Sequence, residues 1–331
     1  MKAKKGGKGK LRKAVGIALC AIIAFLAIFT VVSHAVFRRS DMATAVEIYF
    51  RLSGTKHKFA DPDACAAFIA QRGEAPEYSL NASTLKSGVE ETAVNNCRVY
   101  TLTASDEPDF RVIYLHGGAY VNDASVYQWR FCDRLAWELN AEVIVPIYPL
   151  APNHTWRETF ELLQALYTDQ LPDDGLPLII MGDSAGGGLA VAFCETLNEL
   201  GLEQPDQLIL FSPWLDCSMS NPDIANYEAV DPMLSAYGLV EMGKYWADDL
   251  ELNDYKVSPI FGDVSCLRNV HLFVGSREIF YPDVCQFHSM LESANVASTL
   301  TVGQGMNHVY PLYPIPEADE AFAQVCNLLA Q

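Results

Sequence analysis

The chain has 331 residues, of which 50% are apolar and 19% are charged, a composition typical of a globular protein. Residues 1–40 hold nine Lys or Arg and no Asp or Glu, whereas residues 41–331 hold 14 basic and 41 acidic residues. So acidic a domain would repel nucleic-acid phosphates and anionic membranes, which excludes nucleic acid as a partner.

The N-terminal segment has the pattern of a membrane anchor. A basic tail at 1–13 precedes an uncharged apolar run of 19 residues, Ala14–Val32, close to the ~20 that span a bilayer. The heavier positive flank predicts a cytoplasmic tail, a transmembrane signal anchor at 14–37 and a domain at 41–331 outside the cytoplasm. The alternative is a signal peptide cleaved near Ser33-His34-Ala35, which would leave a secreted domain, although the apolar run exceeds the usual length.

The rest of the chain alternates between strand-like and helical segments. Residues 42–52 and 62–72 are expected to form short amphipathic helices, in a cap at about 41–75. Strands are expected within 87–104 and at Arg111–Leu115, Ala141–Ile147, Leu176–Met181, Gln207–Phe211, His271–Val274 and Ser298–Val302, and helices at Trp129–Leu139, Trp156–Gln170, Ala185–Leu200, Val284–Ala294 and Glu317–Ala330. This alternation predicts an α/β fold with a mostly parallel sheet flanked by helices. The stretch 216–262 breaks it and is interpreted as an insertion near the active-site face.

The cysteines show no metal-binding pattern. All nine are scattered, with no C-x-x-C pair, so the sequence predicts no metal site and assigns no disulfide. Oligomeric state stays open.

Gly182-Asp183-Ser184-Ala185-Gly186 fits the G-x-S-x-G pattern between a predicted strand and a predicted helix. Small residues are needed there because the serine sits on a sharp, strained turn, and the helix N-terminus then faces it with free N–H groups. A glycine-rich turn capped by the serine is the alternative. The context favours Ser184 as a nucleophile.

His116-Gly117-Gly118 follows the strand expected at Arg111–Leu115. A tetrahedral oxyanion requires preorganised N–H donors, and glycines let the backbone approach a substrate closely. We assign the N–H groups of Gly117, Gly118 and Ala185 to an oxyanion hole. Tyr120 and Trp214 are expected to shape the substrate pocket, although both aromatic rings fit ordinary packing equally well.

The base and the acid follow from chain order, which in this kind of fold runs serine, acid, histidine. Of the seven histidines, only His308 lies in a loop after the last predicted strand, so it is the expected base. Glu278 lies close to the end of the preceding strand and is the expected acid. Asp283 is the alternative, but its place suggests a helix first turn, where carboxylates are favoured anyway.

With these residues assembled, the chain resembles the hormone-sensitive-lipase-like branch of α/β-hydrolases, including bacterial esterases and steryl acetyl hydrolases. The motifs that carry the resemblance are Tyr114–Tyr120, Tyr148–Pro152, Gly182–Gly187, Ser212–Asp216, Asp231-Pro232 and Ser258-Pro259. Two positions depart from the family: Ala119 replaces the third glycine of the HGGG motif, and Glu278 stands where Asp is more common.

The resemblance implies an α/β-hydrolase fold with an N-terminal helical cap and hydrolysis of carboxylic esters, often with short acyl chains, without metal or cofactor. The expected partner is therefore a small-molecule ester, with membrane contact through the N-terminal helix. Two alternatives remain at this point: a serine peptidase on the same scaffold, and a non-catalytic binding domain.

Overall fold

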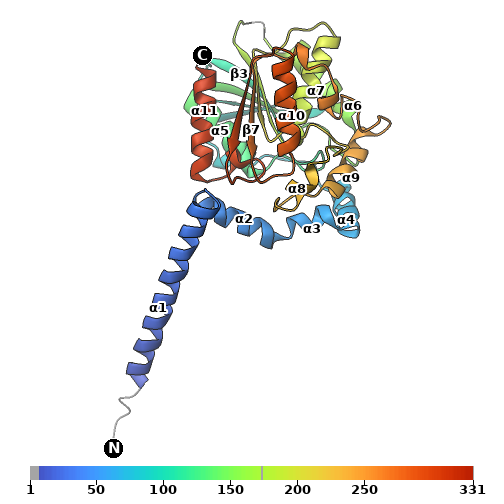
Figure 1. The fold of residues 1–331 in the computed structure, drawn as a ribbon. Helices are drawn as coiled ribbons and strands as arrows, with labels where there is room; N and C mark the ends of the chain where they lie inside the picture. The colour runs from blue at the N-terminus through green and yellow to red at the C-terminus, as the bar shows by residue number, and fades with distance from the viewer. Residues whose placement is uncertain (1–6, 173, 331) are drawn as a thin grey trace, which may run out of the picture.

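The computed structural model describes residues 7–172 and 174–330, and its centre is an eight-stranded sheet in the order β1-β2-β4-β3-β5-β6-β7-β8 (Figure 1). Strands β3 to β8 run parallel, whereas β2 pairs antiparallel with both β1 and β4. The strands are β1 (Gly88–Val94), β2 (Cys97–Thr103), β3 (Phe110–Leu115), β4 (Ala141–Pro146), β5 (Leu178–Asp183), β6 (Gln207–Phe211), β7 (Val270–Gly275) and β8 (Ser298–Gly303).

Helices cover both faces of this sheet. Apolar side chains alternate along each strand, so that Ile180 of β5 belongs to one buried core and Met181 to the other. The first core includes α6 (Trp156–Ala165), α7 (Ala185–Glu199) and α10 (Tyr281–Ser293), and the second includes α5 (Val126–Leu139) and α11 (Pro316–Leu329). The predicted α/β architecture with a mostly parallel sheet is therefore confirmed. Apart from the C-terminal end of α6, the element ends are shifted by at most three residues.

The predicted helix at 156–170 changes character before its end. Helix α6 closes at Ala165, and residues Leu166–Gln170 continue as a π-helical turn. Its first turn is fixed by a capping box in which Thr155 and Glu158 satisfy each other's backbone N–H groups.

The cap region and the insertion meet at the carboxyl ends of the parallel strands. The cap contains α2 (Asp41–Ser53) and α4 (Pro62–Gly73), as expected, and also the short α3 (Thr55–Ala60), which was not anticipated. The insertion contributes α8 (Ile224–Glu228) and α9 (Ala236–Ala247). Helix α9 packs directly on α3, where a side chain on Gly238 would collide with Phe59.

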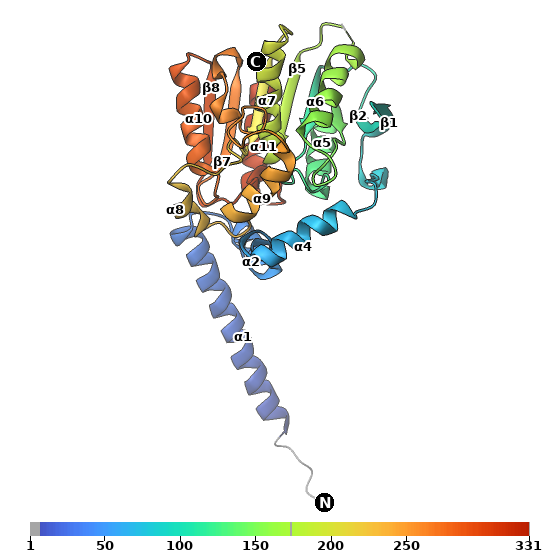
Figure 2. The same ribbon diagram turned by 90° about the vertical axis from the view of Figure 1, so that its right-hand side faces the viewer.

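Helix α1 (Gly7–Val31) and the π-helical residues Val32–Val36 project away from the domain (Figures 1 and 2). Within it, Lys13–Val36 is long and apolar enough to cross a membrane, with a mean hydropathy of 2.9, and no residue of its 18-residue apolar window is buried. Residues 1–6 of the expected basic tail lie outside the described residues.

Candidate active site

Ser184 occupies a strained turn between β5 and α7. Its φ of 53° and ψ of −123° are unusual for a residue with a side chain, and such strain persists only where the surrounding structure enforces it. The turn depends on Gly186, because a side chain there would collide with the carbonyl oxygens of Leu115 and His116. The strand-turn-helix context expected from the sequence is present, with Ser184 at the carboxyl edge of the sheet.

The structure brings Ser184, His308 and Glu278 together from three distant segments. His308 Nε2 lies 2.9 Å from Ser184 Oγ, and His308 Nδ1 lies 2.7 Å from Glu278 Oε2. All three side chains are buried. A hydroxyl, an imidazole and a carboxylate in this order are the arrangement that activates a serine nucleophile.

Glu278 is held by more than the histidine. Its other oxygen, Oε1, accepts hydrogen bonds from Ser212 Oγ at 2.8 Å and from the Gly275 N–H at 2.7 Å. Ser212 Oγ in turn accepts the Val309 N–H at 2.9 Å. The Ser212 hydroxyl therefore ties the acid to the histidine loop, a role that sequence reasoning missed although Ser212 lies within a motif of the resemblance.

Asp283, the alternative acid, lies elsewhere. Its Oδ1 accepts a hydrogen bond from Asn221 Nδ2 at 2.8 Å, and no bond joins it to His308. Burial raises the pKa of Asp283 to about 7, because the charged form is poorly solvated there. The geometry thus places Glu278, and not Asp283, behind the imidazole.

Asp231 is a second buried carboxylate near the imidazole, and sequence reasoning assigned it no role. Its oxygens accept the N–H groups of Met233, Leu234 and Ile279 at 2.7–2.9 Å. Burial disfavours the charged form of His308, but the hydrogen bond and charge of Glu278, with the charges of Asp231 and Asp183, raise the pKa of His308 above 6.5. The signal for Asp231 in the sequence was the Asp-Pro pair.

The assignment of the Gly117 N–H to the oxyanion hole is wrong. This group donates to Asp183 Oδ1 at 3.0 Å, and Asp183 also accepts hydrogen bonds from Tyr114 and Gln128. A side chain at Gly117 would collide with Asp183 and Ser184, so this glycine provides close packing behind the elbow. In the part of the chain that the structure describes, the N–H groups of Gly118, Ala119 and Ala185 have no protein acceptor.

A cavity of about 280 Å³ opens onto Ser184 and His308. Its walls come from the oxyanion loop, the cap and the insertion, and include Phe50, Phe59, Met233, Leu234 and Leu239. Asp123, half-buried at this cavity, has a pKa raised by burial. A small, largely apolar chamber beside the Ser184 hydroxyl has room for a small uncharged group.

Tyr120 and Trp214 do not line this cavity, which corrects the expectation for both. They are 1% and 0% exposed, their ring centroids lie 5.5 Å apart, and Tyr120 also stacks on Trp246 at 4.1 Å. Both rings therefore stabilise the core beneath the site.

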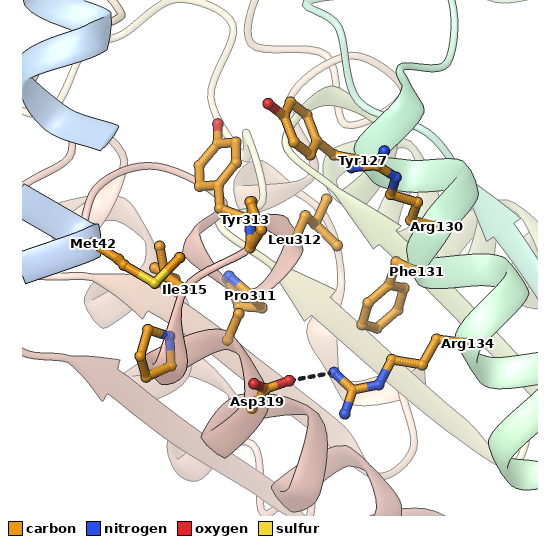
Figure 3. A pocket seen from close by; sticks show the side chains of 13 residues that line it. Met42, Tyr127, Arg130, Phe131, Arg134, Pro311, Leu312, Tyr313, Ile315 and Asp319 are labelled. Carbon is orange, nitrogen blue, oxygen red and sulfur yellow. Dashed lines mark hydrogen bonds and ion pairs between the residues drawn. The ribbon is translucent and has the colours of Figure 1, made fainter. Parts of the chain in front are cut away.

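Figure 3 shows a second hollow, of about 440 Å³. Tyr127 and Tyr313, whose rings meet edge to face, line both hollows and so form the wall between them. Its rim carries Met42 of α2 and the ion pair of Arg134 with Asp319, at 2.7 Å. None of the three triad-like residues reaches it. In the described ranges, no group of three or more His, Cys, Asp or Glu side chains could hold a metal ion.

Comparisons with known proteins identify the fold and the relatives of this chain. A protein-family model described as the alpha/beta hydrolase fold matches residues 112–312. An esterase from Acinetobacter venetianus is 32% identical over 222 residues, covering 65% of this chain and 72% of that protein. An acetyl-hydrolase from Streptomyces hygroscopicus is 25% identical over 233 residues, covering 69% and 78%.

Among solved structures, an esterase from the bacterial hormone-sensitive lipase family matches with a TM-score of 0.73, over 88% of this chain and 98% of that one. At 22% identity this match shows a shared fold only. The relatives named esterase and acetyl-hydrolase support ester hydrolysis. The chain therefore belongs to the α/β-hydrolase fold family and is a carboxylesterase or lipase-like hydrolase.

Proposed function

We propose that this esterase works through an acyl-enzyme on Ser184. His308 Nε2 accepts the hydroxyl proton as Ser184 Oγ bonds to the ester carbonyl carbon, and Glu278 stabilises the imidazolium. The imidazolium then protonates the departing alkoxide as the ester C–O bond breaks. Water, deprotonated by His308, attacks the acyl-enzyme and releases the acid, which restores the Ser184 hydroxyl.

The oxyanion of each tetrahedral intermediate is proposed to accept the N–H groups of Gly118, Ala119 and Ala185. Their lack of a protein acceptor supports this assignment, because a free donor fixed by the backbone stabilises developing charge without reorganisation. Gly118 and Ala119 both have positive φ, 142° and 54°, so the loop has a conformation imposed by its surroundings. Losing one such donor typically costs about 10²–10³ in kcat.

The observation that carries the proposal is the continuous chain of hydrogen bonds from Ser184 Oγ through His308 to Glu278, with both distances below 3 Å. The non-catalytic alternative is disfavoured because domains of that kind lack a member of such a set.

The proposed substrates are esters of short acyl chains, acetyl-like in size, with a small or lipophilic alcohol. The cavity of about 280 Å³ lies at the small end of ligand pockets, about 300–1,000 Å³, and its walls are mainly apolar. The printed name of the Streptomyces relative, acetyl-hydrolase, agrees with a short acyl group. The N-terminal helix is proposed to be an uncleaved anchor with the domain outside the cytoplasm, and a cleaved signal peptide is the alternative.

Ser184→Ala tests the mechanism. The exchange removes the nucleophile but leaves the fold, so kcat on 4-nitrophenyl acetate should fall about 10⁴–10⁶-fold, and labelling by a fluorophosphonate should vanish. Ester turnover that survives the exchange would refute the assignment. A panel of aryl esters and aminoacyl amides tests the peptidase alternative, which would win if amides were cleaved faster than esters.

A further inference from the structure

Helix α2 leaves a row of large apolar side chains uncovered. Leu52 is 82% and Tyr49 65% exposed, and Met42 and Ile48 are about half exposed. The opposite side of the same helix buries Ala43, Thr44 and Glu47 against the domain. Met42, Tyr49 and Leu52 lie three and seven residues apart, which places them on one helix face. Contiguous exposed apolar side chains of this kind mark surfaces that bind a membrane or another molecule.

Helix α2 lies on the side of the molecule from which α1 projects, and its uncovered face is opposite the side that is buried against the domain. In both ribbon views α2 crosses the end of the domain at the base of α1, with the sheet on its other side (Figures 1 and 2). Only four residues, 37–40, separate the π-helical end of α1 from the first residue of α2. If α1 spans a bilayer, α2 is therefore held at the surface of that bilayer.

The position of α2 on the domain is firmly set. Arg39 and Glu47 form a buried ion pair at 2.5 Å, Arg277 approaches Glu47 at 3.2 Å, and Arg39 Nη1 donates to the Gly305 carbonyl at 2.8 Å. Gly305 has a φ of 73° and contacts the Phe37 carbonyl so closely that no side chain would fit. The juxtamembrane backbone thus packs on the loop that carries His308.

The charge of this region differs from the rest of the domain. Residues 38–58 hold five Lys or Arg and two Asp or Glu, whereas residues 59–331 hold 11 basic and 39 acidic residues. A strongly acidic body would keep its distance from an anionic surface, but the segment next to the anchor carries a local positive excess. Apolar side chains flanked by Lys and Arg are the signature of a helix that lies in the membrane interface.

The catalytic cavity lies directly behind this helix. Phe50 of α2 and Thr55 and Phe59 of α3 line it together with Ser184 and His308. The cavity itself has room for a short acyl group, so the alcohol part of a larger ester has to extend past the cap. The part of its wall formed by α2 and α3 lies on the side of the molecule that would face the proposed bilayer surface.

We propose that the exposed face of α2, formed by Met42, Ile48, Tyr49 and Leu52, docks on the lipid bilayer that holds α1. The docked helix presents the cavity to esters whose lipophilic alcohol stays in the bilayer while the short acyl group enters. This deepens the proposed esterase function and rests on it and on the uncleaved anchor.

Photolabelling tests the docking directly. The full-length Ser184→Ala protein, with its anchor verified by mass, is placed in phosphatidylcholine vesicles that contain a diazirine on a lipid acyl chain. After irradiation, mass spectrometry should find lipid on α1 and on peptides from residues 41–53, but not on the peptide with Trp137, which is 53% exposed on α5. Label on α1 alone would overturn the proposal. The exposed face of α2 would then contact water or a second copy of the chain instead of lipid.

Matched variants test the delivery of substrate. Leu52→Glu and the control Trp137→Glu each place a carboxylate at an exposed apolar position. Turnover of hexadecyl acetate dissolved in the vesicles is compared with that of soluble 4-nitrophenyl acetate, which shares the acyl group. Leu52→Glu should lower kcat/KM for hexadecyl acetate about fivefold or more, since a carboxylate cannot enter the apolar part of the interface, and leave 4-nitrophenyl acetate within twofold.

The possible results distinguish a failure of the interfacial role of α2 from a failure of the proposed esterase mechanism. Equal losses on both esters in Leu52→Glu, equal effects of Trp137→Glu, or no effect of either would overturn the interfacial role. Absence of 4-nitrophenyl acetate hydrolysis in the unmodified protein would instead remove the proposed esterase mechanism, while the photolabelling pattern would still report on α2.

Discussion

At the residue scale, His308 is subject to opposing influences. Burial lowers the affinity of its ring for a proton, whereas Glu278, Asp231 and Asp183 raise it, and the net effect is a pKa above 6.5. A protonated ring cannot accept the Ser184 proton, so activity should be low in acid and rise as the ring loses its proton. Because the pKa is raised, the midpoint of kcat/KM should lie above 6.5.

A pH profile of kcat/KM on 4-nitrophenyl acetate, corrected for spontaneous hydrolysis, checks this expectation. Asp231→Asn should shift the midpoint to lower pH, because it removes one of the charges that favour the imidazolium. A rate that stays flat from pH 5 to 8 would count against His308 as the base.

The two candidate acids give a matched pair of exchanges. Glu278→Gln keeps the size of the side chain but removes the charge that stabilises the imidazolium, so kcat should fall about 10²–10⁴-fold, as in related triads. Asp283→Asn should change kcat less than about threefold, because Asp283 bonds to Asn221 and not to the imidazole. The reverse order of effects in steady-state kinetics would make Asp283 the acid.

At the scale of elements, the contact between β3 and α7 decides the shape of the site. Gly186 lies against the carbonyl oxygens of Leu115 and His116, the residues that lead into the oxyanion loop. Gly186→Ala should therefore destabilise the fold by about 1–3 kcal/mol and displace that loop, which lowers kcat as well. Gly88→Ala in the edge strand β1 is the control, because its new methyl group would meet only an ordinary contact with Thr103.

Denaturant unfolding and steady-state kinetics on the two variants measure both effects. Gly88→Ala should stay within about 0.5 kcal/mol of the parent. A Gly186→Ala protein as stable and as active as Gly88→Ala would show that the elbow tolerates a side chain, and the packing argument would fail.

The helices and strands could be predicted from local sequence patterns, whereas the tertiary contacts between them could not. The strands at 207–211 and 298–302 and the helices on both faces were readable because buried parallel strands are apolar runs of characteristic length. Helix α3 was missed because six residues with two lysines and a histidine carry too little periodicity. The packing of α3 on α9 joins segments about 180 residues apart, and no local signal reports such a contact.

At the scale of the whole molecule, the chain combines a catalytic domain with one helix that is long and apolar enough to span a membrane. If this helix is an uncleaved anchor, the protein should stay with membranes through a sodium carbonate wash. A membrane-impermeant fluorophosphonate added to intact cells should label the parent and not Ser184→Ala, because the domain is expected outside the cytoplasm.

Controls decide between the alternatives for this segment. Release of a shortened protein by the wash, or its recovery from the medium, would indicate cleavage near residues 33–35. Labelling only after the cells are permeabilised would place the domain on the cytoplasmic side and reverse the predicted topology.

The sequence by itself determined the fold class and the candidate triad, because each depends on short-range pattern: a strand, a tight turn with small residues, a helix, and an order of residues along the chain. Sequence motifs and chain order single out Ser184, Glu278 and His308, and the structure joins the three by hydrogen bonds of 2.9 and 2.7 Å. Only the tertiary structure showed that the Gly117 N–H bonds to Asp183 and that Tyr120 and Trp214 pack inside the core. It also showed that one face of α2 is left uncovered next to α1. Hydrogen-bond partners and solvent exposure depend on which distant segments of the chain come into contact. Local sequence patterns do not report such contacts.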